Sequence, residues 1–289
     1  LFDRVRLLST LTERLAHIVE LLETATAGEA APEFAAFRAA ACRLPFPEEQ
    51  LREDLQEGAP LPEILLILRL EGALQSWGDH SKWDVRDSGD FPSKSGVVGL
   101  LSCAMGLERG DPEIAALSAA LHMAVRVDRP GIRVMDFHTV QGYPLYNAEG
   151  KPRSSNTVIS PRWYLQDASF LVVLDLPVDS RERVTAALKQ PVWPIYLGRK
   201  SCVPSRPVFE GVTEAYSDLL DAIQRYPVCM RKGDKSAPQA LYYECEIPGD
   251  GVGSFTRPDE RLSGGREFGL RTVYRGVITR EGQDVSDEN

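Results

Sequence analysis

The stretch LLILRLEGALQSWG, Leu65 to Gly78, decides the fold that this sequence predicts. An aliphatic run from Ile64 to Leu70 stands at its start, and such a run is typical of a central strand that is buried on both faces. The residues from 72 to 92 are rich in glycine, aspartate and serine, which indicates a loop. We therefore expect a core that is built around one buried strand and followed by a long connection.

Downstream of this loop, helical and strand patterns alternate around one long polar insertion. We expect helices at Ser95–Leu107, where Ser93 or Ser95 can cap the first turn, and at Ser180–Lys189, and strands at His122–Val127 and Ala168–Leu176 with another starting at Val192–Leu197. The order strand, helix, strand, insertion, strand, helix, strand predicts an α+β fold with a ferredoxin-like, RRM-type core. The insertion, residues 131–163, predicts a β-hairpin thumb with its turn near Asn147–Gly150.

Three segments follow from these patterns. Residues 1–60 predict a helical appendage or a linker to an upstream domain, because leucines and valines recur at three- and four-residue steps before two prolines. Residues 61–211 hold the core and the thumb. Residues 212–289 predict a smaller, β-rich C-terminal part, with a helix near Tyr216–Arg225 and strands at Leu241–Ile247 and Leu270–Thr279.

The composition indicates a cytoplasmic protein with no membrane segment. Of the 289 residues, 43% are hydrophobic, but the longest aliphatic run is far too short to span a bilayer. The five cysteines are widely spaced without a C-x-x-C motif, so we expect buried thiols and neither disulfides nor a metal site. Although the net charge is −9, the segment from Arg183 to Phe209 carries five basic residues and no acid, which is compatible with nucleic-acid binding.

Five blocks of the sequence resemble the CasD family of type I-E CRISPR Cascade complexes, in the order and at the spacing of that family. They are residues 65–78 (LLILRLEGALQSWG), 91–101 (FPSKSGVVGLL), 136–140 (DFHTV), 162–170 (RWYLQDASF) and 196–202 (YLGRKSC). The resemblance covers about residues 64–210, is loose after Val212, and leaves residues 1–60 unmatched. Asp90 departs from the pattern, because some relatives carry arginine there.

The resemblance implies a non-catalytic, RNA-binding subunit. Its expected partners are the 5′ handle of the CRISPR RNA, the Cascade backbone subunit (Cas-seven type) whose filament it caps, and the large PAM-recognising subunit (Cas-eight type). Target DNA would be engaged only indirectly. No cofactor is expected, since the sequence carries no H-E-x-x-H motif and no Rossmann fingerprint.

The candidate RNA contacts are basic, hydroxyl and glycine residues at a helix start, on the thumb and in one loop. A helix N-terminus and a glycine loop with two cations both suit phosphate, and arginine also stacks on bases. The candidates are Ser93, Lys94, Ser95, Gly96, Arg126, His138, Arg153, Arg162, Gly198, Arg199, Lys200 and Ser201. Arg69 and Arg126 lie within expected strands, where they would reach RNA across the sheet face or point to solvent.

Two rival functions remain open at this stage. The first is a metal-independent endoribonuclease that cuts CRISPR repeat RNA, with His138 as base and Tyr143, Lys151 or Arg199 in support. The second is an RRM-like adaptor unrelated to CRISPR. The aliphatic first strand lacks the aromatic pattern of RRM proteins, so binding through loops and thumb is favoured over binding on the sheet face.

Overall fold

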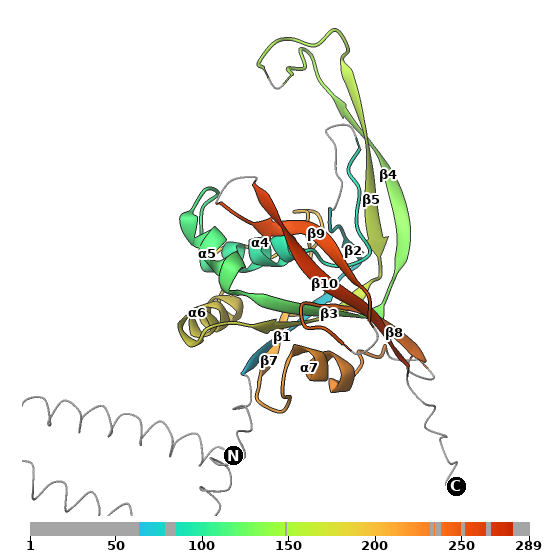
Figure 1. Cartoon of the computed structure of the whole chain (residues 1–289). Helices are drawn as coiled ribbons and strands as arrows, with labels where there is room; N and C mark the ends of the chain where they lie inside the picture. Colours follow the sequence, from blue (N-terminus) through green and yellow to red (C-terminus); the bar gives the residue numbers. More distant parts are fainter. Residues whose placement is uncertain are drawn as a thin grey trace, which may run out of the picture. The chain divides into compact units, whose positions relative to one another are not determined.

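A computed structural model of the chain describes residues 64–78, 85–147, 149–231, 234, 238–249, 252–263 and 267–279, all within one unit that spans Leu61–Asn289 (Figure 1). The helices expected in residues 1–57 lie outside the described residues. The elements, in chain order, are β1 (Leu65–Glu71), β2 (Leu74–Gln75), α4 (Lys94–Met105), α5 (Pro112–Ala120), β3 (His122–Arg129), β4 (Ile132–Gln141), β5 (Thr157–Gln166), β6 (Ser169–Asp175), α6 (Val178–Lys189), β7 (Phe209–Thr213), α7 (Leu219–Arg225), β8 (Ala240–Cys245), β9 (Ser254–Arg261) and β10 (Phe268–Thr279).

A seven-stranded sheet in the order β7-β1-β6-β3-β8-β10-β9 forms the body, and its strand pairings are antiparallel. The mixed helix and sheet class expected from the sequence is therefore confirmed. The three last strands extend the same sheet instead of forming a separate one.

The central strand β1 separates two hydrophobic cores because its side chains alternate between the faces of the sheet. Leu66, Leu68 and Leu70 pack with α4, α5 and α6, whereas Leu65 and Ile67 pack with α7 on the other face. Figure 1 shows α7 on the opposite side of the sheet from the other helices. The expected burial of this strand on both faces is confirmed.

The hairpin predicted between the second and third core strands is formed by β4 and β5. Ten consecutive residue pairs join the two strands, from Ile132 opposite Gln166 to Gln141 opposite Thr157. β2 pairs with the other edge of β5, so the hairpin is part of a small three-stranded sheet. Figure 1 shows the hairpin projecting far beyond the body. The turn expected at its tip is present, since the Gly150 N–H donates to the Asn147 carbonyl at 3.1 Å.

One expected strand is absent among the described residues, and several elements were not expected. The strand expected at Val192–Leu197 is irregular, because Pro194 interrupts it and the Leu197 N–H bonds to the Cys202 carbonyl in a tight loop. The strand that pairs with β1 in its place is β7 (Phe209–Thr213). The helix α5 and the strand β9 were not anticipated.

Candidate nucleic-acid interface

Arginines from two neighbouring segments lie side by side at the base of the hairpin. Arg86, in the connection after β2, forms an isolated parallel β-bridge with Arg162 of β5. The Arg86 N–H donates to the Pro161 carbonyl at 2.9 Å, and the Trp163 N–H donates to the Arg86 carbonyl at 2.8 Å. Because bridge partners project to the same face of a sheet, the geometry brings two like charges together.

Arg199, from the loop before β7, joins this pair. One terminal nitrogen of its guanidinium donates to the carbonyl oxygens of Arg86 and Asp87, each at 3.1 Å. The guanidinium carbon lies 4.7 Å from the centre of the Tyr164 ring, a cation–π contact. Three segments that are distant in the sequence therefore meet at this arginine.

The loop that carries Arg199 can form only with glycine at position 198. Gly198 has φ +86°, and a Cβ added there would lie 1.8 Å from the Ser76 carbonyl oxygen. The Cys202 N–H donates to the Arg199 carbonyl at 2.8 Å and closes the turn. Lys200 and Ser201, between them, are exposed. The loop thus keeps its glycine against the body and presents a lysine and a hydroxyl to solvent.

The carboxylates near this cluster have other partners. Asp90 pairs with Arg133 at 2.6 Å, and Asp136, which lies opposite Arg162 in the hairpin, is 3.8 Å from Nδ1 of His138. The Nε of Arg162 is buried without a hydrogen-bond partner among the described residues. The thumb base, defined here as Arg86, Arg162, Gly198, Arg199, Lys200 and Ser201, is therefore suited to an external anion such as a phosphate.

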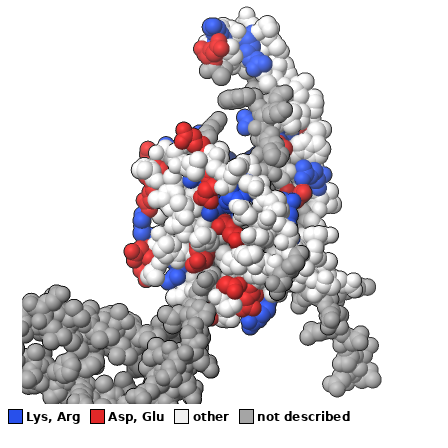
Figure 2. Space-filling model, viewed as in Figure 1, with Lys and Arg blue, Asp and Glu red and all other residues white. Residues whose placement is uncertain are grey.

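His138 and Arg153 lie further out along the hairpin. His138 belongs to β4, opposite Ser160, and its side chain is 37% exposed. Arg153 is exposed near the tip, where its N–H donates to the Leu145 carbonyl. On the face drawn in Figure 2, acidic and basic side chains are interleaved over the body, and both signs appear at the hairpin tip. The structure thus distributes the expected cations along the hairpin instead of gathering them in one patch.

The N-terminus of α4 is occupied from within the protein, which corrects the expected phosphate site. Ser93 caps the helix by accepting from the Gly96 N–H at 3.2 Å, as expected. The Lys94 N–H donates to Asp259 of β9 at 2.8 Å, and its ammonium pairs with Glu260 at 2.6 Å. The Lys94 side chain is only 4% exposed. A carboxylate therefore holds the position that an RNA phosphate would need, while Ser95 and Gly96 remain partly exposed.

Asp259 is the centre of a larger ion-pair network between α4 and the last strands. Arg271 contacts both of its oxygens, at 2.6 and 3.0 Å, and Arg257 lies at 3.6 Å. Burial favours the neutral acid, but the hydrogen bonds and charge of Arg271 outweigh it and hold the pKa of Asp259 below its ordinary value. Sequence reasoning missed this network, although the charged run RPDER at the end of β9 was a signal.

Arg69 and Arg126 are buried on the α7 face of the sheet, so neither expectation for them holds. Arg126 is 0% exposed, pairs with Asp128 at 2.6 Å, and donates to the carbonyls of Ile223 and Tyr226 at 2.6 and 2.7 Å. Those carbonyls end α7, where the helix dipole favours a cation. The proposed RNA contact at Arg126 is withdrawn, because its guanidinium stabilises the packing of α7.

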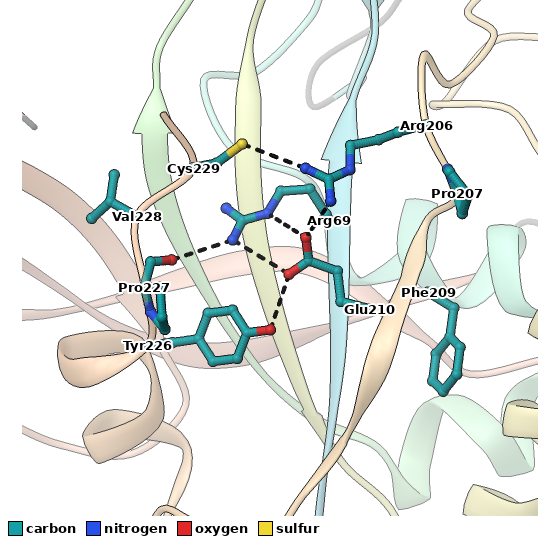
Figure 3. Close-up of a pocket in the computed structure, with 9 residues that line it drawn as sticks. All are labelled: Arg69, Arg206, Pro207, Phe209, Glu210, Tyr226, Pro227, Val228 and Cys229. Atoms are coloured by element: carbon teal, nitrogen blue, oxygen red, sulfur yellow. Dashed lines mark hydrogen bonds and ion pairs between the residues drawn. The ribbon is translucent and has the colours of Figure 1, made fainter. Parts of the chain in front are cut away.

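Arg69 forms the floor of a cavity of about 490 Å³ beside β7 (Figure 3). Its guanidinium pairs with Asp128 and with Glu210 at 3.3 Å, and it donates to the Pro227 carbonyl at 3.4 Å. The Glu210 carboxylate also pairs with Arg206 at 3.0 Å and accepts a hydrogen bond from the Tyr226 hydroxyl at 3.1 Å. The charged groups around this cavity are thus paired with one another, so it is a weaker candidate for an anion than the thumb base.

The remaining expectations from the sequence concern the burial of Trp77 and the cysteines, metal ligands and membrane-spanning helices. Trp77 is buried in the first core, and Cys202 and Cys245 are buried thiols as expected, whereas Cys103 and Cys229 are only half-buried. Burial raises the pKa of the Cys245 thiol to about 11. Within the described ranges, no group of three histidine, cysteine or acidic residues is placed to hold a metal ion. The described helices include none that is long and apolar enough to cross a membrane.

The family comparison places this chain among the CRISPR-associated proteins of the Cas5 class. The family model described as "CRISPR-associated protein (Cas_Cas5)" matches residues 65–274, and the chain belongs to this family. It is homologous to the CRISPR system Cascade subunit CasD of Escherichia coli (strain K12), with 34% identity over 236 residues, which cover 76% of this chain and 98% of the relative.

Two solved structures share the fold. One, titled "CRISPR RNA-guided surveillance complex", contains a chain with 31% identity and a TM-score of 0.60, over 74% of this chain and 89% of that chain. Another, "Crystal structure of Cas protein", matches with 34% identity and a TM-score of 0.56, over 74% of this chain and 95% of the other. The resemblance seen in the five sequence blocks is therefore confirmed.

Proposed function

We propose that this chain is a non-catalytic subunit of a type I-E Cascade surveillance complex that binds the 5′ handle of the CRISPR RNA and caps the backbone filament. The observation that supports this most directly is the thumb base, where Arg86 and Arg162 lie side by side at the foot of a projecting hairpin. Single-stranded RNA is bound through its phosphates by such basic surfaces. Homology to a Cascade subunit and likeness to a chain of a CRISPR RNA-guided surveillance complex support CRISPR RNA as the ligand.

We infer that the first half of the body is a ferredoxin-like unit. The order β7-β1-β6-β3, with α4 and α6 as the crossovers, is the arrangement that the strand–helix–strand–strand–helix–strand plan requires. In an RRM the sheet face opposite the helices binds RNA, but here α7 packs on that face and fills it with Leu219, Ala222 and Ile223. This supports binding through the loops and the hairpin.

The proposed partners follow from the two faces of the hairpin. The alternation of β4 and β5 puts Asp136, His138 and Arg162 on one face, and the exposed apolar side chains of Met135, Phe137 and Ile159 on the other. Exposed apolar residues gathered on one surface mark protein contacts. We propose that the apolar face meets the Cascade backbone subunit, and that the complex works in the cytoplasm with a large PAM-recognising subunit and, indirectly, target DNA.

The ribonuclease alternative finds less support than capping. Cleavage by 2′-hydroxyl attack needs a base and, beside it, a cation that stabilises the negative charge developing on the phosphate. Among the described residues, the charged group beside His138 is the Asp136 carboxylate, 3.8 Å from Nδ1, which is an anion and not the cation that cleavage needs. Lys151 pairs with Glu149 at 3.2 Å near the tip. We therefore propose that His138 and Arg153 contact RNA without cutting it.

Preferential binding of handle-bearing RNA tests the proposal. The purified chain, with the backbone subunit present, should retain RNA that begins with the repeat-derived handle and release RNA of equal length in which the handle is scrambled. Equal retention of both RNAs would reduce the proposal to non-specific phosphate binding, and retention of neither would overturn it.

A further inference from the structure

We infer that Arg199 is a positioning residue, which holds the segment of Arg86 against β5 so that Arg86 and Arg162 present two cations at a fixed spacing. This inference rests on the proposed RNA binding and assigns different roles to residues of the thumb base. In it, Arg86 and Arg162 contact phosphate directly, whereas Arg199 acts through Arg86.

The donors of Arg199 are directed into the protein. One terminal nitrogen already donates to two carbonyl oxygens, those of Arg86 and Asp87. The other terminal nitrogen is buried, with no hydrogen-bond partner among the described residues. The face of the guanidinium lies over Tyr164, a side chain that is 6% exposed. The hydrogen bonds and the ring contact of this guanidinium are therefore all made within the protein.

Arg199 holds the Arg86 segment through a hydrogen bond to the Arg86 carbonyl oxygen. This oxygen accepts both the Trp163 N–H of β5 and the Arg199 guanidinium. The bridge between Arg86 and Arg162 is isolated, so a single residue on each side carries it. Two arginines at such a bridge repel each other while no anion is bound. An additional charge-assisted bond to the same carbonyl opposes this repulsion and keeps Arg86 in place.

Only arginine can make this set of contacts. Its planar guanidinium stacks on an aromatic ring with its face while it donates from its edge, whereas a lysine ammonium is a compact point charge. The loop that carries Arg199 is fixed by Gly198 against the Ser76 carbonyl, so a shorter or differently shaped side chain cannot approach by moving the loop. Replacement by lysine would therefore keep the charge and lose the positioning.

A double-mutant cycle with Arg86→Ala, Arg199→Lys and the double variant tests the inference. The readouts are the dissociation constant for repeat RNA and its salt dependence, measured with the backbone subunit present. Arg86→Ala should weaken binding about tenfold. Arg199→Lys should weaken binding by a similar factor although the net charge is unchanged, and the double variant should bind no worse than Arg86→Ala alone.

Hydrogen exchange of the RNA-free protein provides a second readout. Arg199→Lys should accelerate exchange at the Arg86 and Trp163 amides, while the amides of β1 and β6 keep their protection. If Arg199→Lys does not fold, Tyr164→Leu, which removes the stacking platform, replaces it in both measurements. Wild-type binding by Arg199→Lys, or losses that add in the double variant, would overturn the inference. Failure of the unmodified protein to bind RNA would instead overturn the proposed function.

Discussion

At the scale of residues, Arg86 and Arg162 are two positive charges whose neighbouring carboxylates have other partners. Their backbones are held by ladder hydrogen bonds, and the neighbouring acids Asp90 and Asp136 are paired with Arg133 and placed near His138. Arg86 is exposed and Arg162 is half-buried, with its Nε buried and without a hydrogen-bond partner among the described residues. Their side chains contribute more to binding than to folding, so their removal should be visible in RNA affinity while stability is retained.

We predict that Arg86→Ala and Arg162→Ala each reduce the salt dependence of RNA binding. Removal of one arginine–phosphate ion pair should lower the slope of log K against log salt by about 0.7 for single-stranded RNA. The measurement is a titration of repeat RNA at several salt concentrations. Arg183→Ala is the matched control, because Arg183 is an exposed arginine on α6 that pairs with Glu113. An unchanged slope in both thumb-base variants would remove these residues from the interface.

The same scale shows what the sequence could and could not predict about the site. The loop 198–201 is a candidate from the sequence because glycine followed by two cations has a local signature, and the structure places its Arg199 against the segment of Arg86. Lys94 was misassigned because its partners are remote, with Asp259 lying 165 residues after it. Arg126 has its ion-pair partner Asp128 two residues away, but the α7 carbonyls that enclose it lie about 100 residues later. A single sequence does not reveal which cations such long-range contacts will neutralise.

At the scale of elements, the contact between α4 and β9 joins the first described helix to one of the last strands. Asp259 binds the helix N-terminus and pairs with two buried arginines. We predict that Asp259→Asn destabilises the protein by roughly 1–3 kcal/mol, because it removes one of the two carboxylates that pair with each buried arginine, while Arg257 keeps Glu244 and Arg271 keeps Glu246. Chemical denaturation measures this, with Asp179→Asn on the exposed face of α6 as the control. A destabilisation below about 1 kcal/mol would contradict the structural role of the network.

This contact also has a defined pH dependence. Because the pKa of Asp259 is lowered in the folded state, the unfolded chain binds more protons in the window between the two pKa values. The stabilisation is complete above the unfolded pKa, about 4, and is lost as the pH falls through the folded value. The measurement is the free energy of unfolding as a function of pH. The decrease that protonation of Asp259 causes at low pH should be missing in Asp259→Asn.

The hairpin is the element that we assign to partner contacts. We predict that Phe137→Ser weakens capture by the backbone subunit at least severalfold and leaves the melting temperature unchanged, because Phe137 is 61% exposed and contributes little to the body. Val140→Ser, on the other face of the same strand, is the control. Equal effects of the two substitutions in a pull-down would mean that the apolar face is not the docking surface.

The elements also differ in how predictable they were. The aliphatic strand β1 and the Ser93-capped helix α4 follow from local patterns and were found. β7 has the sequence FEGVT, whose central glycine is a poor strand former, and it is a strand because it pairs with β1. The apolar run at 192–197 looked like a better strand, but Pro194 and the turn at Gly198 prevent it from joining the sheet.

On the scale of the whole molecule, net charge is a poor guide to the proposed function. The total is −9, but part of the acidic charge is engaged inside the body, where Asp128, Glu244 and Asp259 pair with buried arginines. The thumb base keeps cations that these acids do not reach. An acidic protein can therefore present a basic surface to RNA.

We predict that His138→Ala leaves the fate of repeat RNA unchanged. The histidine is half-exposed beside Asp136, and the proposed role of the chain requires no proton transfer. Incubation of end-labelled repeat RNA with the wild-type and variant proteins should give the same intact RNA. Cleavage by the wild type that disappears in His138→Ala would make this residue catalytic.

The most direct test of the account is a gel assay of the purified chain with end-labelled repeat RNA in EDTA, with and without the backbone subunit. We predict intact RNA in both samples, and stable capture only when the backbone subunit is present. A discrete cleavage product that releases the 5′ handle would identify a ribonuclease and contradict the capping role. Absence of capture in both samples would limit the relationship to the fold alone.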